Sequence, residues 1–151
     1  MPDLSFQEKS VWGSAVAVAA CSIYYFSTVF GMYVEGEADP GRAGELGISL
    51  LVALIVIEIV YHSILAAMSR STESDERDRW IETRASRNGY VALGIGAFAL
   101  VGHLLIGTAW GEAQYPGMTT PFAIANLLLL AMVVAELVKY ASQIVYYRTG
   151  E

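Results

Sequence analysis

Hydrophobic residues gather in four long runs along this chain of 151 residues, and polar segments separate the runs. The runs cover about residues 11–34, 46–68, 89–110 and 121–145. Each is at least as long as the roughly 20 residues that an α-helix needs to cross the hydrocarbon core of a bilayer. The pattern therefore predicts an all-α integral membrane protein, with four transmembrane helices in one domain of residues 1–151.

Turn-forming residues stand between the runs. Asp39-Pro40-Gly41 is typical of a turn before the second helix. Thr120 followed by Pro121 is typical of a cap and first-turn proline that open the fourth helix. Connections this short force neighbouring helices to pack antiparallel, so we expect a four-helix bundle.

A short pattern recurs in the second and fourth runs. Glu58 begins the segment Glu-Ile-Val-Tyr-His, and Glu136 begins Glu-Leu-Val-Lys-Tyr. This similarity is consistent with two repeated helical hairpins related by an axis along the membrane normal. Chance matching between apolar helices explains it equally well.

Composition supports a membrane location and limits the function. Hydrophobic residues make up 55% of the chain, and the mean hydropathy is +0.47. The net charge of -6 argues against direct nucleic acid binding, because phosphate contacts need clustered Lys and Arg. Eight of the nine basic residues lie in the segment 69–88 or near the chain ends, which the positive-inside rule places in the cytoplasm. We therefore expect both termini to be cytoplasmic, in the plasma (inner) membrane of a prokaryote.

The segment 69–88 is the most highly charged part of the chain. Its early acids and late arginines suit a helix dipole, so the third helix should begin before its apolar run, capped by Ser71 or Thr72. This cytoplasmic loop can be a solvated helical hairpin, or it can be a docking surface for a cytoplasmic partner. The residues of the docking surface would be Asp75, Glu76, Arg77, Arg79, Trp80, Arg84 and Arg87.

Polar side chains inside the apolar runs are the candidates for function. Helical spacing places Glu58 and His62 on one face of the second helix, and Glu136 and Tyr140 on one face of the fourth. We expect these groups to face the bundle rather than lipid. The further polar residues of the runs are Asn126, His103 and Lys139.

The depths of these residues can be compared through the helical rise of about 1.5 Å per residue. From the outer helix ends, Glu58, Glu136 and His62 lie about 18, 22 and 24 Å deep, but His103 only about 10 Å. A haem between His62 and His103 is therefore disfavoured, because its two ligands must lie at one level.

A charged acid at the bilayer centre costs about 2.5 to 3.5 kcal/mol. Protonation of Glu58, or pairing with His62, would reduce this cost. Hydrogen bonds that fix the bundle are one explanation for such groups, but each is worth only about 0.6 to 2 kcal/mol. A site that binds a proton, a cation or a small ligand is the other explanation, and we favour it. Whether the site binds a metal is left open.

Sequence motifs of enzymes do not occur. The chain has no phosphate-binding glycine loop, nucleophile elbow or zinc protease motif, so we expect neither catalysis nor a cofactor. The single cysteine, Cys21, cannot form an internal disulfide.

The stretch DERDRWIETRASRNGY resembles a family of small four-helix membrane proteins of bacteria and archaea whose function is unknown. The matching positions are Asp75-Glu76-Arg77, Ile81 and Ala85-Ser86. Members of that family often accompany small helix-turn-helix regulators, so the resemblance implies a membrane-bound regulatory partner. Glu58, His62 and Glu136 lie outside this motif.

Two functions follow from these patterns. The first is a protonatable Glu58–His62–Glu136 site for binding, transport or sensing of a cation or small ligand. The second is an interaction protein whose cytoplasmic loop binds a regulator. Transport would require a homodimer, either through the small-residue face of the third helix, from Gly89 to Gly107, or through the first helix.

Overall fold

The computed structural model describes residues 4–36, 39–69, 72–110 and 120–150. These residues form four α-helices: α1 (Phe6–Val34), α2 (Pro40–Met68), α3 (Glu76–Trp110) and α4 (Thr120–Thr149). All four are long and apolar enough to cross a membrane, which suggests a multi-pass membrane protein. The predicted all-α class with four candidate spans is thereby confirmed.

The first two helices begin several residues before their apolar runs because polar side chains cap them. The Ser5 hydroxyl accepts a hydrogen bond of 3.0 Å from the amide of Glu8 at the start of α1. Asp39 accepts a hydrogen bond of 2.8 Å from the amide of Gly41, and Pro40 is the first residue of α2. The predicted turn at Asp39-Pro40-Gly41 is therefore the capped first turn of a helix.

The α3 helix also begins before its apolar run, as predicted, but its cap differs from the predicted one. The amide of Asp78 donates to Oδ1 of Asp75 at 2.7 Å, and the amide of Asp75 donates to Oδ2 of Asp78 at 3.1 Å. This reciprocal pair is a capping box, and α3 accordingly begins at Glu76. Thr72 lies too early in the chain to cap it, and Ser71 falls outside the described residues.

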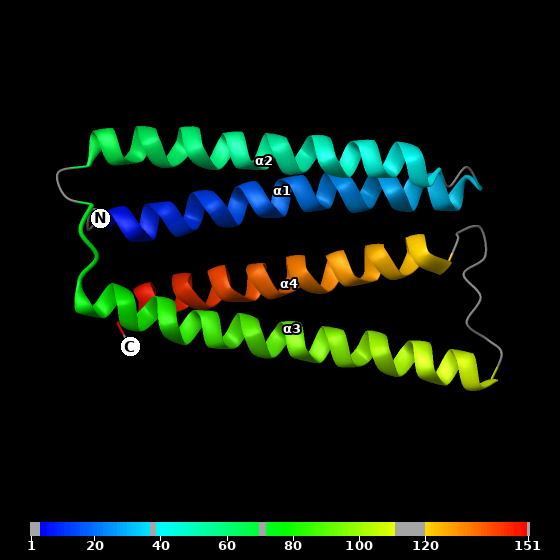
Figure 1. Ribbon diagram of the computed structural model, residues 1–151. Helices are drawn as coiled ribbons and strands as arrows, with labels where there is room; N and C mark the ends of the chain where they lie inside the picture. Colours follow the sequence, from blue (N-terminus) through cyan, green and yellow to red (C-terminus); the bar gives the residue numbers. More distant parts are fainter. Residues whose placement is uncertain (1–3, 37–38, 70–71, 111–119, 151) are drawn as a thin grey trace.

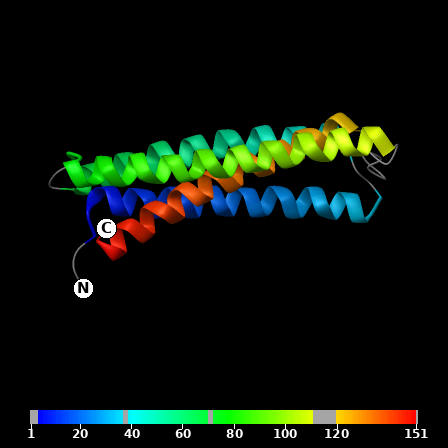
Figure 2. The same ribbon diagram turned by 90° about the horizontal axis from the view of Figure 1, so that it is seen from below.

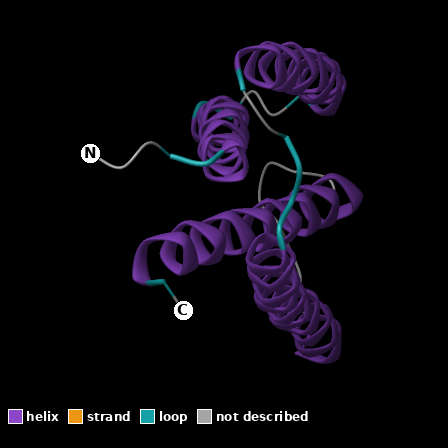
Figure 3. Ribbon diagram, turned by 90° about the vertical axis from the view of Figure 1, so that its left-hand side faces the viewer, coloured by secondary structure: helices purple, strands orange, loops and turns teal. Residues whose placement is uncertain are grey.

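The helices are packed in the order α2, α1, α4, α3 (Figure 3). The α1 helix contacts both α2 and α4, and α4 contacts α3. The start of α1, the α2–α3 connection and the end of α4 lie together at one end, which we name the termini end (Figure 1). Two antiparallel hairpins are thus present. A twofold repeat would also pair α2 with α3 as closely as α1 with α4, and the described residues show no comparable α2–α3 contact.

Small residues allow α3 and α4 to approach closely. A Cβ atom added at Gly89 would lie 3.0 Å from the carbonyl oxygen of Ala135, and one added at Gly96 would lie 2.8 Å from the Ala131 Cβ. The small-residue face of α3 is therefore a packing face, as predicted. However, α4 occupies it at both glycines, so a homodimer cannot use this part of the face without displacing α4.

The α1–α2 contact is built from glycines and tyrosine rings. The Tyr61 ring of α2 fills the space in which a side chain at position 13 of α1 would lie, and its hydroxyl donates a 2.7 Å hydrogen bond to the carbonyl of Lys9. Farther from the termini end, the Tyr25 ring of α1 packs against Gly47 of α2. These contacts set the register between the two helices.

At the termini end, polar contacts join three of the helices. Arg148 near the end of α4 forms a 3.2 Å ion pair with Glu8 of α1. The Tyr147 hydroxyl donates to Asp78 of α3 at 2.8 Å. The α4 helix reaches both neighbours here because it runs obliquely to α1 (Figure 2).

Candidate functional site

Four side chains from α1 and α2 form a hydrogen-bonded group, which we name the Glu58 cluster: Ser10, Ser14, Glu58 and His62. His62 Nε2 lies 2.8 Å from Oε2 of Glu58, and the Ser14 hydroxyl donates to the same oxygen at 2.8 Å. Ser14 Oγ is also 3.3 Å from His62 Nε2, and Ser10 Oγ is 3.2 Å from His62 Nδ1. Each of the two helices supplies two residues spaced four apart.

Antiparallel packing explains why these residues meet. Residues four apart lie on one helix face about 6 Å apart along the axis, so Ser10 and Ser14 can match His62 and Glu58 pairwise. Counted along α2, Glu58 lies about 15 Å from the last residue, Met68. The cluster therefore lies between α1 and α2, in the third of α2 nearest the termini end, with the His62 and Glu58 side chains 36% and 25% exposed.

Tyr140 of α4 adds a third helix to the surroundings of the cluster. Its ring is half-buried, close to Ser14, and within electrostatic range of both Glu58 and Glu136. Of the four residues of the predicted site, the structure joins Glu58 and His62 by a hydrogen bond and places Tyr140 near them. Glu136 lies one turn before Tyr140 on α4.

The carboxyl group of Glu136 differs from our prediction, because it is not enclosed by the bundle. Its side chain is 52% exposed, whereas that of Glu58 is 25% exposed. Lys139, on the same helix, places its Nζ atom 3.6 Å from Oε2 of Glu136. Lys139 supplies a counter-charge from the same helix, so Glu136 does not depend on a partner from a second helix.

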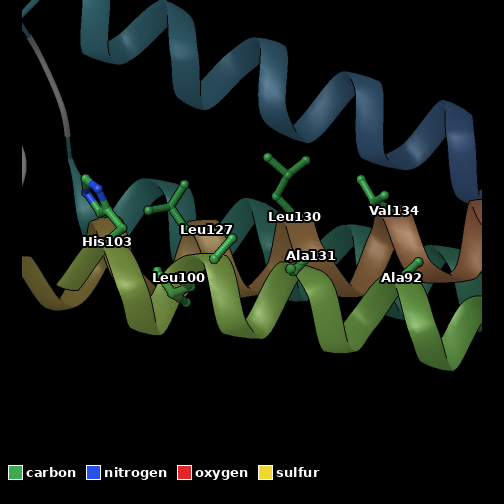
Figure 4. Close-up of a pocket in the computed structure, with 9 residues that line it drawn as sticks. Ala92, Leu100, His103, Leu127, Leu130, Ala131 and Val134 are labelled. Atoms are coloured by element: carbon green, nitrogen blue, oxygen red, sulfur yellow. The ribbon is translucent and has the colours of Figure 1, made fainter. Parts of the chain in front are cut away.

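Asn126 and His103 lie far from the Glu58 cluster. Asn126 accepts a hydrogen bond of 3.0 Å from the Tyr25 hydroxyl and therefore joins α1 to α4. His103 is exposed at the far end of an α3–α4 groove of about 480 Å³, which is lined mainly by alanine, leucine and valine (Figure 4). The two histidines lie toward opposite ends of the bundle, which agrees with the argument against a shared haem.

The predicted docking surface on α3 is partly used within the chain. Arg77 donates a hydrogen bond to the Tyr147 carbonyl of α4 at 3.4 Å. The Trp80 ring packs edge-on against Tyr146, and the Arg84 guanidinium lies 4.8 Å from the Trp80 ring centroid. The exposed members of the surface, other than those three, are Asp75, Glu76, Arg79 and Arg87.

The chemistry of the Glu58 cluster suits protons and cations. It offers one carboxylate, one imidazole and two hydroxyls. Within the described residues, His, Cys, Asp and Glu side chains form no group of three that could hold a metal ion. The cluster is therefore better suited to proton exchange than to a resident metal.

Comparison with known proteins gives no match: no protein-family model, curated protein or solved structure is significantly similar to this chain. The resemblance at Asp75-Glu76-Arg77 therefore stays a prediction. The structure does give some of its residues a local role, since Asp75 caps α3, and Ile81 and Ala85 are fully buried.

Sequence analysis missed Ser10, Ser14 and Tyr25. A serine in an apolar helix is usually a small packing residue, so neither serine stood out. The signal that could have identified them is their own spacing of four, which repeats the spacing of Glu58 and His62. Tyr25 carried no such signal.

Proposed function

We propose that this chain is a non-enzymatic integral membrane protein that binds and exchanges a proton or a cation at the Glu58 cluster. The exchange would serve binding, transport or sensing of a small ligand. The observation that carries this proposal is the placement of both His62 ring nitrogens, one beside Glu58 and the other beside the Ser10 hydroxyl.

Both protonation states of His62 can be satisfied in this geometry. In the neutral ring, Nε2–H donates to Glu58 and Nδ1 accepts from the Ser10 hydroxyl. When the ring gains a proton, Nδ1–H donates to Ser10 Oγ, whose hydroxyl only has to rotate. Ser14 donates to Glu58 in either state. His62 can therefore gain or lose a proton while every polar atom named here keeps a hydrogen-bond partner.

The cost of the site also favours function over adhesion. Interhelical hydrogen bonds in membranes contribute about 0.6 to 2 kcal/mol each. An ionised acid at the bilayer centre costs about 2.5 to 3.5 kcal/mol on insertion scales. Serine pairs alone would join α1 to α2 at a lower free-energy cost of membrane insertion than an acid and an imidazole do.

The orientation follows from the basic residues. Lys9, Arg77, Arg79, Arg84, Arg87 and Arg148 lie at the termini end, whereas Arg42 lies at the other end. By the positive-inside rule, we place the termini end in the cytoplasm of a prokaryote and the chain in its inner membrane. The Glu58 cluster then lies in the cytoplasmic half of the bilayer. A homodimer, if transport needs one, would form through a surface other than the packed face of α3.

The proposal can be tested with the two histidines of the chain, His62 and His103. In nanodiscs, the ring resonances of isotope-labelled histidine are followed by NMR as the pH changes, and His103→Gln assigns them. We expect Glu58→Gln to move the titration of His62 and to leave that of His103 unchanged. Glu45→Gln is the matched control, since Glu45 is an exposed acid near the start of α2. If the His62 titration is the same in Glu58→Gln as in the unmodified chain, the proposal is wrong.

An interaction protein is the second candidate, because Arg79 and Arg87 are exposed on the part of α3 that precedes its apolar run. Paired variants separate the two functions. Under the second reading, Arg79→Ala with Arg87→Ala abolishes capture of a cytoplasmic regulator, and Glu58→Gln with Glu136→Gln leaves capture intact. Capture that survives the arginine changes argues against this surface.

A further inference from the structure

Two exposed arginines, Arg84 and Arg87, lie one turn apart on α3, just before its apolar run. The ion pairs among the described residues join other side chains, so neither arginine has a carboxylate partner in that part of the chain. Helical spacing turns Glu82, the acid nearest in sequence, about 140° or more away from both arginines. Glu76 shares their side of the helix but lies two turns, or about 12 Å, before Arg84. The two positive charges are therefore left without a nearby counter-charge.

Aromatic rings, rather than an acid, hold the side chain of Arg84. Its guanidinium carbon lies 4.8 Å from the ring centroid of Trp80 and 5.8 Å from that of Tyr146. The two rings pack edge-on against each other, and Nδ2 of Asn88 donates a hydrogen bond of 3.0 Å to the Tyr146 hydroxyl. A guanidinium that lies against ring faces keeps the N–H groups in its plane for another acceptor. Arg84 is therefore positioned to bind an anion from outside the chain.

The level of the two arginines along the helices corresponds to the edge of a bilayer. Arg87 and Arg84 lie about 3 and 8 Å before Gly89, where the apolar run of α3 begins. On the adjoining α4 the apolar run continues to Val145, whose neighbour in sequence contacts Trp80. The limits estimated from the two helices lie on either side of the arginines. Headgroups occupy about 5 to 8 Å on each side of the hydrocarbon core, so both guanidinium groups would lie at the level of the lipid phosphates.

We propose that Arg84 and Arg87 bind the phosphate headgroup of an anionic phospholipid, with Trp80 and Tyr146 as positioning residues for Arg84. Charge complementarity carries the inference, because two exposed cations without an acid partner face the layer that contains phosphate. The planar guanidinium group matches two phosphate oxygens at once. Trp and Tyr side chains are also enriched at this layer in membrane proteins. The inference requires the membrane location alone and goes beyond proton exchange at the Glu58 cluster.

A lipid headgroup fits this surface better than a soluble anion or a cytoplasmic protein does. A phospholipid already lies at the right level, so its binding costs less translational freedom than the capture of a molecule from water. A cytoplasmic protein would more readily reach Arg79, which lies about 15 Å before Gly89. A zwitterionic headgroup would bring a third positive charge close to the two arginines, so an anionic headgroup is favoured.

The test measures lipid binding to the full chain in a mild detergent by native mass spectrometry. Dioleoyl phosphatidylglycerol is the anionic probe, and dioleoyl phosphatidylcholine is the zwitterionic one. We expect the unmodified chain to prefer phosphatidylglycerol, and Arg84→Gln and Arg87→Gln each to weaken its binding by about fivefold without changing that of phosphatidylcholine. Arg79→Gln is the matched control, since Arg79 is an exposed arginine about 140° around the helix from Arg84. It should keep the preference.

The aromatic contact is tested separately from the charge. Trp80→Leu should weaken phosphatidylglycerol binding by about two- to fivefold and leave phosphatidylcholine binding unchanged, because the guanidinium loses the ring that orients it. Arg84→Lys keeps the charge without the planar group, so its affinity should fall between those of Arg84→Gln and the unmodified chain. Trp12→Leu is the control, since Trp12 on α1 is 41% exposed, as Trp80 is. Equal losses for the two tryptophan changes would show that Trp80 has no specific role.

Three results would overturn the inference. Equal affinities of the unmodified chain for the two lipids would leave the arginines to the cytoplasmic partner considered above. A loss in Arg79→Gln as large as that in Arg84→Gln would show an effect of net charge instead of a site. Displacement of phosphatidylglycerol by sodium phosphate, but not by sodium chloride of equal ionic strength, would show a site for free phosphate. The His62 titration tests the proposed function separately and does not depend on any of these results.

Discussion

The hydroxyl of Tyr25 in α1 donates a 3.0 Å hydrogen bond to Oδ1 of Asn126 in α4. The amide of Asn126 is oriented in turn by donating from Nδ2 to the carbonyl of Phe122 at 2.9 Å. The ion pair of Glu8 and Arg148 joins the same two helices at the termini end. Since Ser14 lies between Glu8 and Tyr25 along α1, the helix that supplies half of the Glu58 cluster is held on both sides of it.

Removing the Tyr25 hydroxyl should destabilise the α1–α4 contact. We expect Tyr25→Phe to lower the free energy of unfolding by about 0.5 to 1.5 kcal/mol, because Oδ1 of Asn126 loses its donor. Unfolding in mixed micelles gives the value. The neighbouring change Tyr24→Phe is the control, as that ring is exposed. Losses of the same size in both variants would contradict a specific role for the hydrogen bond.

Enlarging the glycines of the α3–α4 contact should separate these helices. Gly96→Val places methyl groups against Ala131, and overpacking of this kind costs about 1 to 3 kcal/mol. Gly94→Val is matched in chemistry, but no other atom lies within 4 Å of the added Cβ. The same unfolding measurement should distinguish the two. A tolerated Gly96→Val would mean that the helices are less closely packed than the structure shows.

The cap of α3 gives a local prediction. Asp75→Ala removes the acceptor of the Asp78 amide and should cost about 1 kcal/mol, with faster hydrogen exchange in the first turn of the helix. Thr72→Ala, which changes a residue ahead of the cap, should leave exchange as it is. Protection of the first turn that survives Asp75→Ala would point to a different start for α3.

The Ser10 hydroxyl should control the titration of His62. Ser10→Ala removes the group that accepts from protonated Nδ1 and donates to neutral Nδ1, so we expect the His62 titration to change. Ser10→Thr keeps a hydroxyl and should preserve the titration. Ser22→Ala changes a serine elsewhere on α1 and serves as the control. If Ser10→Ala leaves the His62 titration unchanged, Ser10 is not part of the site.

The acid and imidazole of the site could be predicted from sequence, but their partners on α1 could not. Glu58 and His62 share one helix, so their spacing alone places them on one face. Ser10 and Ser14 come from a neighbouring helix, and the register between helices depends on contacts such as Tyr61 with Gly13. No pattern within one segment contains that information.

Glu136 and the charged first turns of α3 also differ in part from what the sequence predicted. Glu136 was expected inside because an acid in an apolar run needs compensation, yet Lys139 supplies it at 3.6 Å on its own helix. Arg77, Trp80 and Arg84 are exposed, as expected, but the oblique course of α4 also brings Tyr146 and Tyr147 into contact with them. The contacts of Tyr146 and Tyr147 depend on the placement of α4, whereas the Glu136–Lys139 pair lies within one helix.

Of all residues in α2, only Ala43 is buried by the rest of the chain. In the bilayer that we propose as its surroundings, acyl chains would be the main packing partners of this helix. Hydrocarbon thickness would then act directly on its tilt, since a span longer than the bilayer leans over to match it. The hydrogen bond between Ser14 and Glu58 joins α1, which is held by α4, to α2, which acyl chains would surround. A change in lipid chain length that tilts α2 would therefore alter the geometry of the Glu58 cluster.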